Sequence, residues 1–98
     1  MTPFRELDPL LHSQLRLAIM SVLISVDRAD FSYLREKTGA TAGNLSVQIG
    51  KLKDAGYISV SKSFGESYPQ TICSITDLGR KKFAEYVSSL GDYLKPEA

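Results

Sequence analysis

The sequence contains few of the residues that metal sites, disulfides and acid–base catalysis require. It has one cysteine, Cys73, and one histidine, His12, among 98 residues. One thiol cannot form an internal disulfide, and one thiol with one imidazole cannot complete a tetrahedral metal site within a chain. There is also no Ser/His/Asp or Cys/His set and no glycine loop that would cradle a phosphate. We therefore expect no metal, no cofactor and no enzymatic activity, with Cys73 buried and inert and no role for His12.

Strong charge and long apolar runs are absent as well. The net charge of +1 excludes a polybasic coat, so any contact with nucleic acid must depend on locally placed charge. The most apolar stretch, 15–26, is interrupted by Arg16, Ser21 and Ser25 and is too short to span a bilayer. The first ten residues lack the features of a secretory signal. These absences predict one cytoplasmic domain over residues 1–98 with no membrane partner.

The remaining composition, 43% hydrophobic and 23% charged, is typical of a folded globular domain. Apolar residues recur every three or four positions from Leu10 to Val26, which predicts an amphipathic helix. Pro9 fits its opening turn, and Asp8 can accept the free N–H groups there.

Two further helices follow at short intervals. The polar stretch 27–30 ends the first helix, and a short helix is predicted at 32–38 with Ser32 as its N-cap. A third helix is predicted at about 41–55, capped by Thr41 and ended by Gly56 in the left-handed conformation. Its apolar stripe consists of Leu45, Ile49 and Leu52.

The second half predicts a hairpin and a last helix. Residues 57–63 alternate between apolar and polar side chains, 64–69 form a turn, and 70–75 return as a second strand. Thr76 can cap a final helix that carries apolar residues to Leu94. The predicted fold is mainly α with a small antiparallel β hairpin, a winged helix-turn-helix.

Two motifs carry a family resemblance. Residues 45–58 read LSVQIGKLKDAGYI, and residues 75–80 read ITDLGR after the hairpin. Together with the element order, over roughly residues 15–83, they resemble winged helix-turn-helix transcriptional regulators of the MarR/ArsR type. The resemblance implies a regulator that binds double-stranded DNA, with the helix at 41–55 in the major groove and the wing, about 58–75, on the backbone.

The resemblance also implies which residues contact DNA. The side of the third helix opposite its apolar stripe would face the groove, and Lys62 would extend from the wing. No arginine on that side could read guanine in a bidentate manner, which predicts modest specificity. The predicted DNA-binding residues are Thr41, Gly43, Asn44, Ser46, Val47, Lys51 and Lys62.

The terminal segments, about 1–12 and 84–98, carry more apolar residues than one small core needs, which predicts a homodimer interface. The alternative is that the last helix folds back onto the first helix of its own chain. A second alternative concerns function, namely a winged-helix module that binds protein rather than DNA. The sequence does not indicate whether a small-molecule effector binds. The predicted interface residues are Phe4, Leu7, Leu10, Tyr86, Val87, Leu90, Tyr93 and Leu94.

Overall fold

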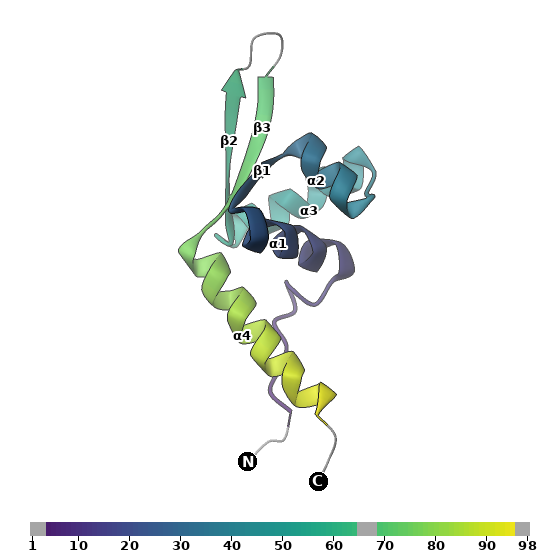
Figure 1. Cartoon of the computed structure of the whole chain (residues 1–98), viewed down its shortest axis with the longest axis vertical. Helices are drawn as coiled ribbons and strands as arrows, with labels where there is room; N and C mark the ends of the chain where they lie inside the picture. The colour runs from purple at the N-terminus through teal and green to yellow at the C-terminus, as the bar shows by residue number, and fades with distance from the viewer. Residues whose placement is uncertain (1–3, 65–68, 96–98) are drawn as a thin grey trace.

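The computed structural model describes residues 4–64 and 69–95, which form four helices around a small antiparallel sheet (Figure 1). Residues 65–68 of the predicted turn, and residues 1–3 and 96–98 of the predicted dimer segments, lie outside the described part. The elements are α1 (Gln14–Val26), β1 (Arg28–Asp30), α2 (Phe31–Thr38), α3 (Ala42–Asp54), β2 (Ile58–Phe64), β3 (Pro69–Ile75) and α4 (Asp77–Leu94).

Helix α1 begins at Gln14, so the predicted start at Leu10 is wrong. Asp8 does not cap this helix. Its Oδ1 accepts the backbone N–H of Leu10 at 2.9 Å, and its backbone oxygen accepts that of His12 at 2.9 Å. These bonds form a separate turn before the helix, which apolar spacing alone cannot distinguish from a first helical turn.

Helices α2 and α3 form the helix-turn-helix. Asp30 rather than the predicted Ser32 is the N-cap of α2, because its carboxylate accepts the N–H of Tyr33 at 2.8 Å. Gly39 ends α2 with a φ of 71°, a left-handed conformation that glycine adopts without a steric penalty. The predicted cap of α3 is confirmed, since the Thr41 hydroxyl accepts the N–H of Asn44 at 3.2 Å.

The sheet has three strands in the order β1-β3-β2, with both pairs antiparallel. The predicted hairpin is β2 with β3, in a register that pairs Val60 with Cys73. Strand β1 was not predicted, because its three residues, Arg-Ala-Asp, are too few and too polar to show alternation. Its partner lies far along the chain, where Ala29 pairs with Cys73.

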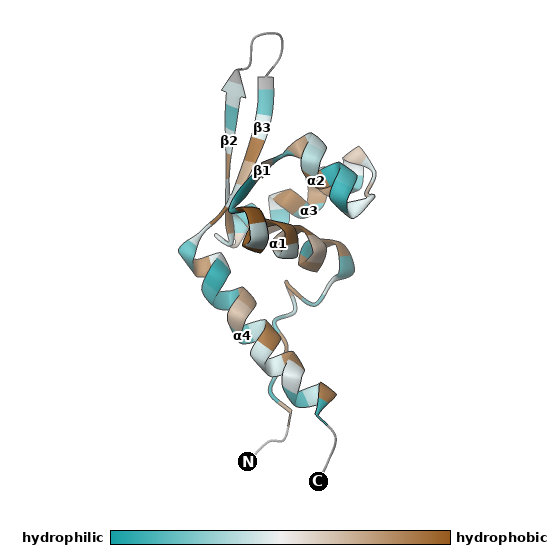
Figure 2. Ribbon diagram, in the orientation of Figure 1, coloured by the Kyte–Doolittle hydropathy of each residue, from teal (hydrophilic) through white to brown (hydrophobic). Residues whose placement is uncertain are grey.

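The core lies where α1, α2 and α3 meet the sheet, and Figure 2 shows apolar residues where α1 and α3 face each other. The side chains that are wholly buried come from all three helices, the sheet and the turn before α1. They are Leu11, Ile19, Met20, Leu23, Leu34, Leu45, Leu52 and Cys73. The predicted apolar stripe of α3 is confirmed, since Ile49 is buried with its two leucines.

The two sequence motifs meet at one corner of the molecule. The Thr76 hydroxyl donates to the carbonyl oxygen of Gly56 at 2.6 Å, lies 3.0 Å from that of Tyr57, and accepts the N–H of Gly79 at 2.9 Å. It therefore caps α4 and attaches the start of that helix to the end of the helix-turn-helix. A Cβ at Gly79 would lie 2.1 Å from the Tyr57 carbonyl oxygen, so this close approach requires glycine.

Helix α4 extends away from this corner, and the chain is elongated, with extents of 58 × 25 × 20 Å. The β2–β3 hairpin lies at one end, and the end of α4 lies at the other beside the start of the described N-terminal residues (Figure 1). None of the helices in the described ranges is long and apolar enough to cross a membrane.

The Gly79 corner gives a stability prediction. Gly79→Ala should lower the free energy of unfolding by about 2 kcal/mol or more, because the new methyl group would overlap backbone that cannot move freely. Gly50→Ala is the matched control. A Cβ there meets nothing within 4 Å, so this variant should gain about 0.5–1 kcal/mol from helix propensity. Urea unfolding measures both, and equal stabilities would contradict the role of the corner.

Tyr57 gives a prediction for alkaline stability. Burial, and then the 2.5 Å hydrogen bond that it donates to Asp8, raise the pKa of Tyr57 to about 12. The neutral phenol is favoured in the folded chain, so its contribution is complete below the unfolded pKa of about 10 and is lost between about pH 10 and 12. Tyr57→Phe should lower the stability at pH 7 by about 1 kcal/mol and flatten this alkaline loss. Urea unfolding from pH 7 to 11 tests this, with the exposed Tyr33→Phe as control; an unchanged alkaline slope in Tyr57→Phe would contradict it.

Candidate nucleic-acid interface

The side of α3 opposite the core forms an exposed surface, here called the outer face. Its members are Gly43, Ser46, Val47, Gly50 and Lys51, with Asn44 at the margin. Val47 is 55% exposed although it is apolar, and nothing in the described chain covers it. Thr41, which caps the helix, is also exposed. The structure thus places all six predicted residues of this helix region on one accessible surface.

Two members of the outer face, Gly43 and Gly50, have no side chain. A Cβ built at Gly43 or Gly50 would meet no atom within 4 Å, so neither glycine is required by packing inside the chain. Each lowers helix propensity by about 0.5–1 kcal/mol relative to alanine. Their positions allow another molecule to approach the helix backbone closely.

Asn44 belongs to a hydrogen-bonded chain of three side chains. The Gln48 side-chain nitrogen donates to Asn44 Oδ1 at 3.1 Å, and Arg16 on α1 donates to Gln48 Oε1 at 2.5 Å. Sequence reasoning missed Gln48 and Arg16. The four-residue spacing of Asn44 and Gln48 on one helix is a usable signal for the first contact. No local pattern indicates the second contact, because Arg16 approaches from another helix.

The wing contributes the remaining predicted residue. Lys62 is exposed in β2, where its backbone pairs with Thr71 of β3. The alternation of β2 buries Ile58 and half-buries Val60, and their packing against the core fixes the strand that carries Lys62. Figure 1 shows this hairpin extending beyond α1, α2 and α3, which lie beside its lower part, while α4 leads away in the other direction.

Positive charge is concentrated around the helix-turn-helix and wing. Residues 28–63 contain six basic side chains and three acidic ones, although the whole chain is nearly neutral. None of the six forms an ion pair with a carboxylate of the described residues; elsewhere Arg5, Arg80 and Lys82 form such pairs, and Arg16, Lys81 and Lys95 do not. The six are Arg28, Arg35, Lys37, Lys51, Lys53 and Lys62. Their charge is therefore available to an external anion.

Comparison with known proteins identifies the fold family. A family model described as winged helix DNA-binding domain matches residues 15–94. The chain belongs to this family. The predicted winged helix-turn-helix is confirmed, with a third strand added to its hairpin.

Relatives of this winged-helix domain cover most of its length. An uncharacterized protein of Methanocaldococcus jannaschii is 34% identical over 76 residues, covering 78% of this chain and 83% of the relative. A transcriptional regulator homologue of Pyrococcus horikoshii has a TM-score of 0.82 at 30% identity, covering 87% and 84% of the two chains. A candidate regulator of Salmonella typhimurium has a TM-score of 0.73 at 22% identity, covering 87% and 74%. Both of these solved structures are described as transcriptional regulators or their homologues.

The predicted dimer residues of the winged-helix domain fall into two groups. Tyr86 is only 4% exposed, and Leu7, Leu10 and Leu90 are half-buried against the core. The inference that these four lack partners in their own chain is therefore wrong. The other four are exposed to solvent: Phe4 at 44%, Val87 at 51%, Tyr93 at 43% and Leu94 at 73%.

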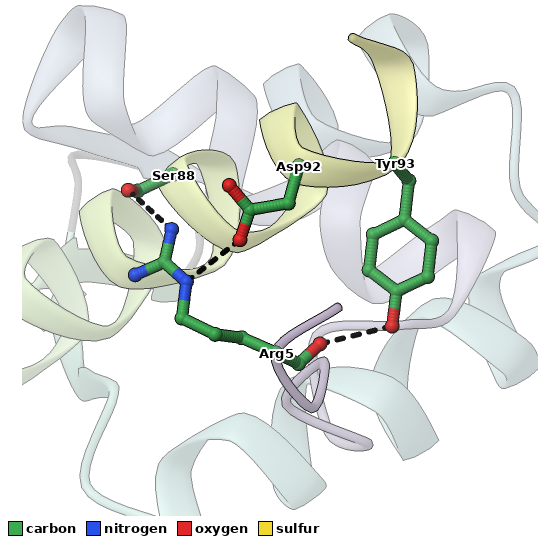
Figure 3. Close-up of polar contacts among 4 residues, drawn as sticks. All are labelled: Arg5, Ser88, Asp92 and Tyr93. Atoms are coloured by element: carbon green, nitrogen blue, oxygen red, sulfur yellow. Dashed lines mark hydrogen bonds and ion pairs between the residues drawn. The ribbon is translucent and has the colours of Figure 1, made fainter. Parts of the chain in front are cut away.

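The N-terminal segment, residues 4–13, is hydrogen-bonded to the end of α4 (Figure 3). Arg5 donates to Asp92 at 2.8 Å and to Ser88 at 2.9 Å, and the Tyr93 hydroxyl donates to the Arg5 carbonyl oxygen at 2.9 Å. The hydrogen bond from Arg5 lowers the pKa of Asp92 below its ordinary value. Both groups are exposed, so the ion pair orients the segment more than it stabilises the fold.

His12 and Cys73 lie away from the outer face. His12 Nδ1 lies 2.9 Å from the Tyr86 hydroxyl, so it connects the N-terminal segment to α4, a contact that the sequence did not indicate. Cys73 is fully buried, as predicted, and burial raises its pKa to about 11, which keeps the thiol protonated at neutral pH.

Proposed function

We propose that this winged-helix domain is a homodimeric transcriptional regulator that binds double-stranded DNA. Helix α3, within residues 41–55, would lie in the major groove, and the wing, residues 58–75, would lie on the phosphate backbone. The observation that carries the proposal is the exposed outer face of α3 beside basic side chains with no ion-pair partner among the described carboxylates. Such cations release condensed counterions when they meet phosphates, which favours binding to DNA.

Each exposed side chain has a contact that suits its chemistry. Lys51 and Lys62 would contact phosphates, and Ser46 and Asn44 would donate or accept hydrogen bonds at base edges. Val47 would contact a thymine methyl group. Thr41 and Gly43, at the start of the helix, would let it approach the groove closely. With no arginine on the outer face, discrimination between sequences would be modest.

The dimer would form through α4 and the N-terminal segment. Ala84, Val87, Gly91 and Leu94 are spaced three, four and three residues apart, which places them along one side of α4. A Cβ at Gly91 would meet nothing within 4 Å, so this side is open to a second helix. Because α4 leads away from the wing, pairing there leaves both outer faces free. Two-fold symmetry would place two recognition helices about 34 Å apart, one turn of DNA.

The DNA-binding proposal is tested by salt. Affinity for duplex fragments, measured by fluorescence anisotropy, should fall steeply as salt rises. Lys51→Ala and Lys62→Ala should each weaken binding to all sequences alike and reduce the salt slope by about one. Lys95→Ala, at the far end of α4, removes the same charge and should change neither. Absence of binding to mixed-sequence and genomic DNA at low salt would contradict the proposal. It would favour a module that binds a protein partner, whose affinity would depend little on salt.

The dimer is tested by introducing charge on α4. Val87→Asp should leave the fold intact, because this side chain is half exposed in the single chain, and should convert a sedimenting dimer to a monomer. Affinity for DNA should fall by at least tenfold, since one half-site makes half of the contacts. Leu78→Asp is the matched control, because it lies on the opposite side of the same helix and is 42% exposed. Dimeric Val87→Asp with normal affinity would place the interface elsewhere.

A further inference from the structure

We propose that Arg16 is a positioning residue that determines, through Gln48, which group of Asn44 faces the DNA bases. The inference rests on the proposed function, since it assumes that α3 enters the major groove. It adds two residues that do not lie on the outer face, and it assigns the amide nitrogen of Asn44 as the group that reads a base.

The geometry is a continuous chain of hydrogen bonds from α1 to α3. Arg16 Nε donates to the Leu10 carbonyl oxygen at 2.6 Å, and Arg16 Nη1 donates to Gln48 Oε1 at 2.5 Å. Gln48 Nε2 then donates to Asn44 Oδ1 at 3.1 Å. Arg16 and Gln48 are half-buried, whereas Asn44 is exposed. The first two side chains are thus partly covered by the protein, and the last one is the most accessible to solvent.

The chemistry of arginine fixes which group donates and which accepts in this series of hydrogen bonds. A guanidinium group has five N–H donors, has no acceptor and remains charged at every relevant pH. Only the oxygen of Gln48 can therefore face Arg16, which leaves the nitrogen of Gln48 facing Asn44. That nitrogen requires an acceptor, so Asn44 must present its oxygen inward. The NH₂ group of Asn44 is then the group left free on the exposed side.

A free NH₂ group selects among base edges. In the major groove it can donate to O6 or N7 of guanine, O4 of thymine or N7 of adenine, whereas an amide oxygen can accept only from N4 of cytosine or N6 of adenine. With its amide held by Gln48, Asn44 would favour guanine, thymine or adenine over cytosine at the base that it contacts. Without the hydrogen bonds from Arg16 through Gln48, the Asn44 amide could rotate and present either its NH₂ group or its oxygen to the base.

The decisive variant is Gln48→Glu. A carboxylate still accepts from Arg16 but cannot donate, so the Asn44 amide must turn over and donate its NH₂ inward. The oxygen of Asn44 would then face the groove. In binding-site selection, followed by competition between oligonucleotides that differ at one base, we expect the preference at that base to change from guanine or thymine to cytosine, while adenine, which has both an acceptor and a donor, is tolerated in both cases. The expected change in relative affinity is about fivefold or more.

Four control variants separate this role from other effects. Lys53→Met lowers the net charge of α3 by one, as Gln48→Glu does. It should weaken binding to all sites alike without changing the base preference. Arg16→Met should relax the preference toward equality, and Arg16→Lys should restore much of it because lysine is also a donor only. In the double variant Asn44→Ala with Gln48→Glu, the preference change should disappear, because Gln48 acts through Asn44.

The outcomes separate the inference from the proposed function. If the unmodified chain shows no salt-dependent DNA binding, both are overturned. If it binds but Gln48→Glu keeps the original base preference, the inference fails and the proposed function stands. A preference change that persists in the double variant would show that position 48 contacts DNA itself, which also overturns the inference. NMR of the free protein gives an independent check, since Arg16→Met should increase the mobility of the Gln48 and Asn44 side-chain amides, and unchanged amide signals would count against it.

Discussion

The Thr76 hydroxyl joins three parts of the molecule at one point. It caps α4 through Gly79, and it contacts the carbonyl oxygens of Gly56 and Tyr57, where the helix-turn-helix ends and the wing begins. The missing side chain of Gly79 allows the helix to approach this backbone. The direction of α4 relative to α3 is therefore set by a few hydrogen bonds and one steric requirement. The spacing of the two outer faces in the proposed dimer would depend on this direction of α4, and so on this corner.

The elements that the sequence predicted well are those with local causes. Thr41 and Thr76 cap helices through bonds to residues three positions later, and Gly39 and Gly56 adopt positive φ immediately after helices. Such signals need no knowledge of distant residues. The start of α1 was misplaced because a local signal can belong to two kinds of structure. The bond of Asp8 forms a turn before the helix instead of the first turn of the helix. Local chemistry thus shows that an element exists more reliably than where it begins.

The features that the sequence did not reveal depend on distant partners. Strand β1 exists because Ala29 pairs with Cys73, and Tyr86 is buried because the turn before α1 packs against it. The outer face of α3 was predicted from helical periodicity. The Arg16–Gln48 contact could not be predicted in this way, because the two residues lie on different helices and are 32 positions apart in the sequence. The residues that would touch DNA were therefore accessible to sequence reasoning, whereas the residue that orients one of them was not.

The N-terminal segment runs from the far end of α4 to the base of the wing. Arg5 binds the far end of α4, Asp8 accepts from Tyr57 at the start of the wing, and the carbonyl oxygen of Leu10 accepts from Arg16. A single stretch of chain thus contacts the proposed dimer arm, the base of the wing and the side chain that reaches α3. The Arg5 contact is exposed and individually weak, whereas the other two are partly buried. The Asp8 and Arg16 contacts therefore do more than the Arg5 contact to hold this segment against the base of the wing and α1.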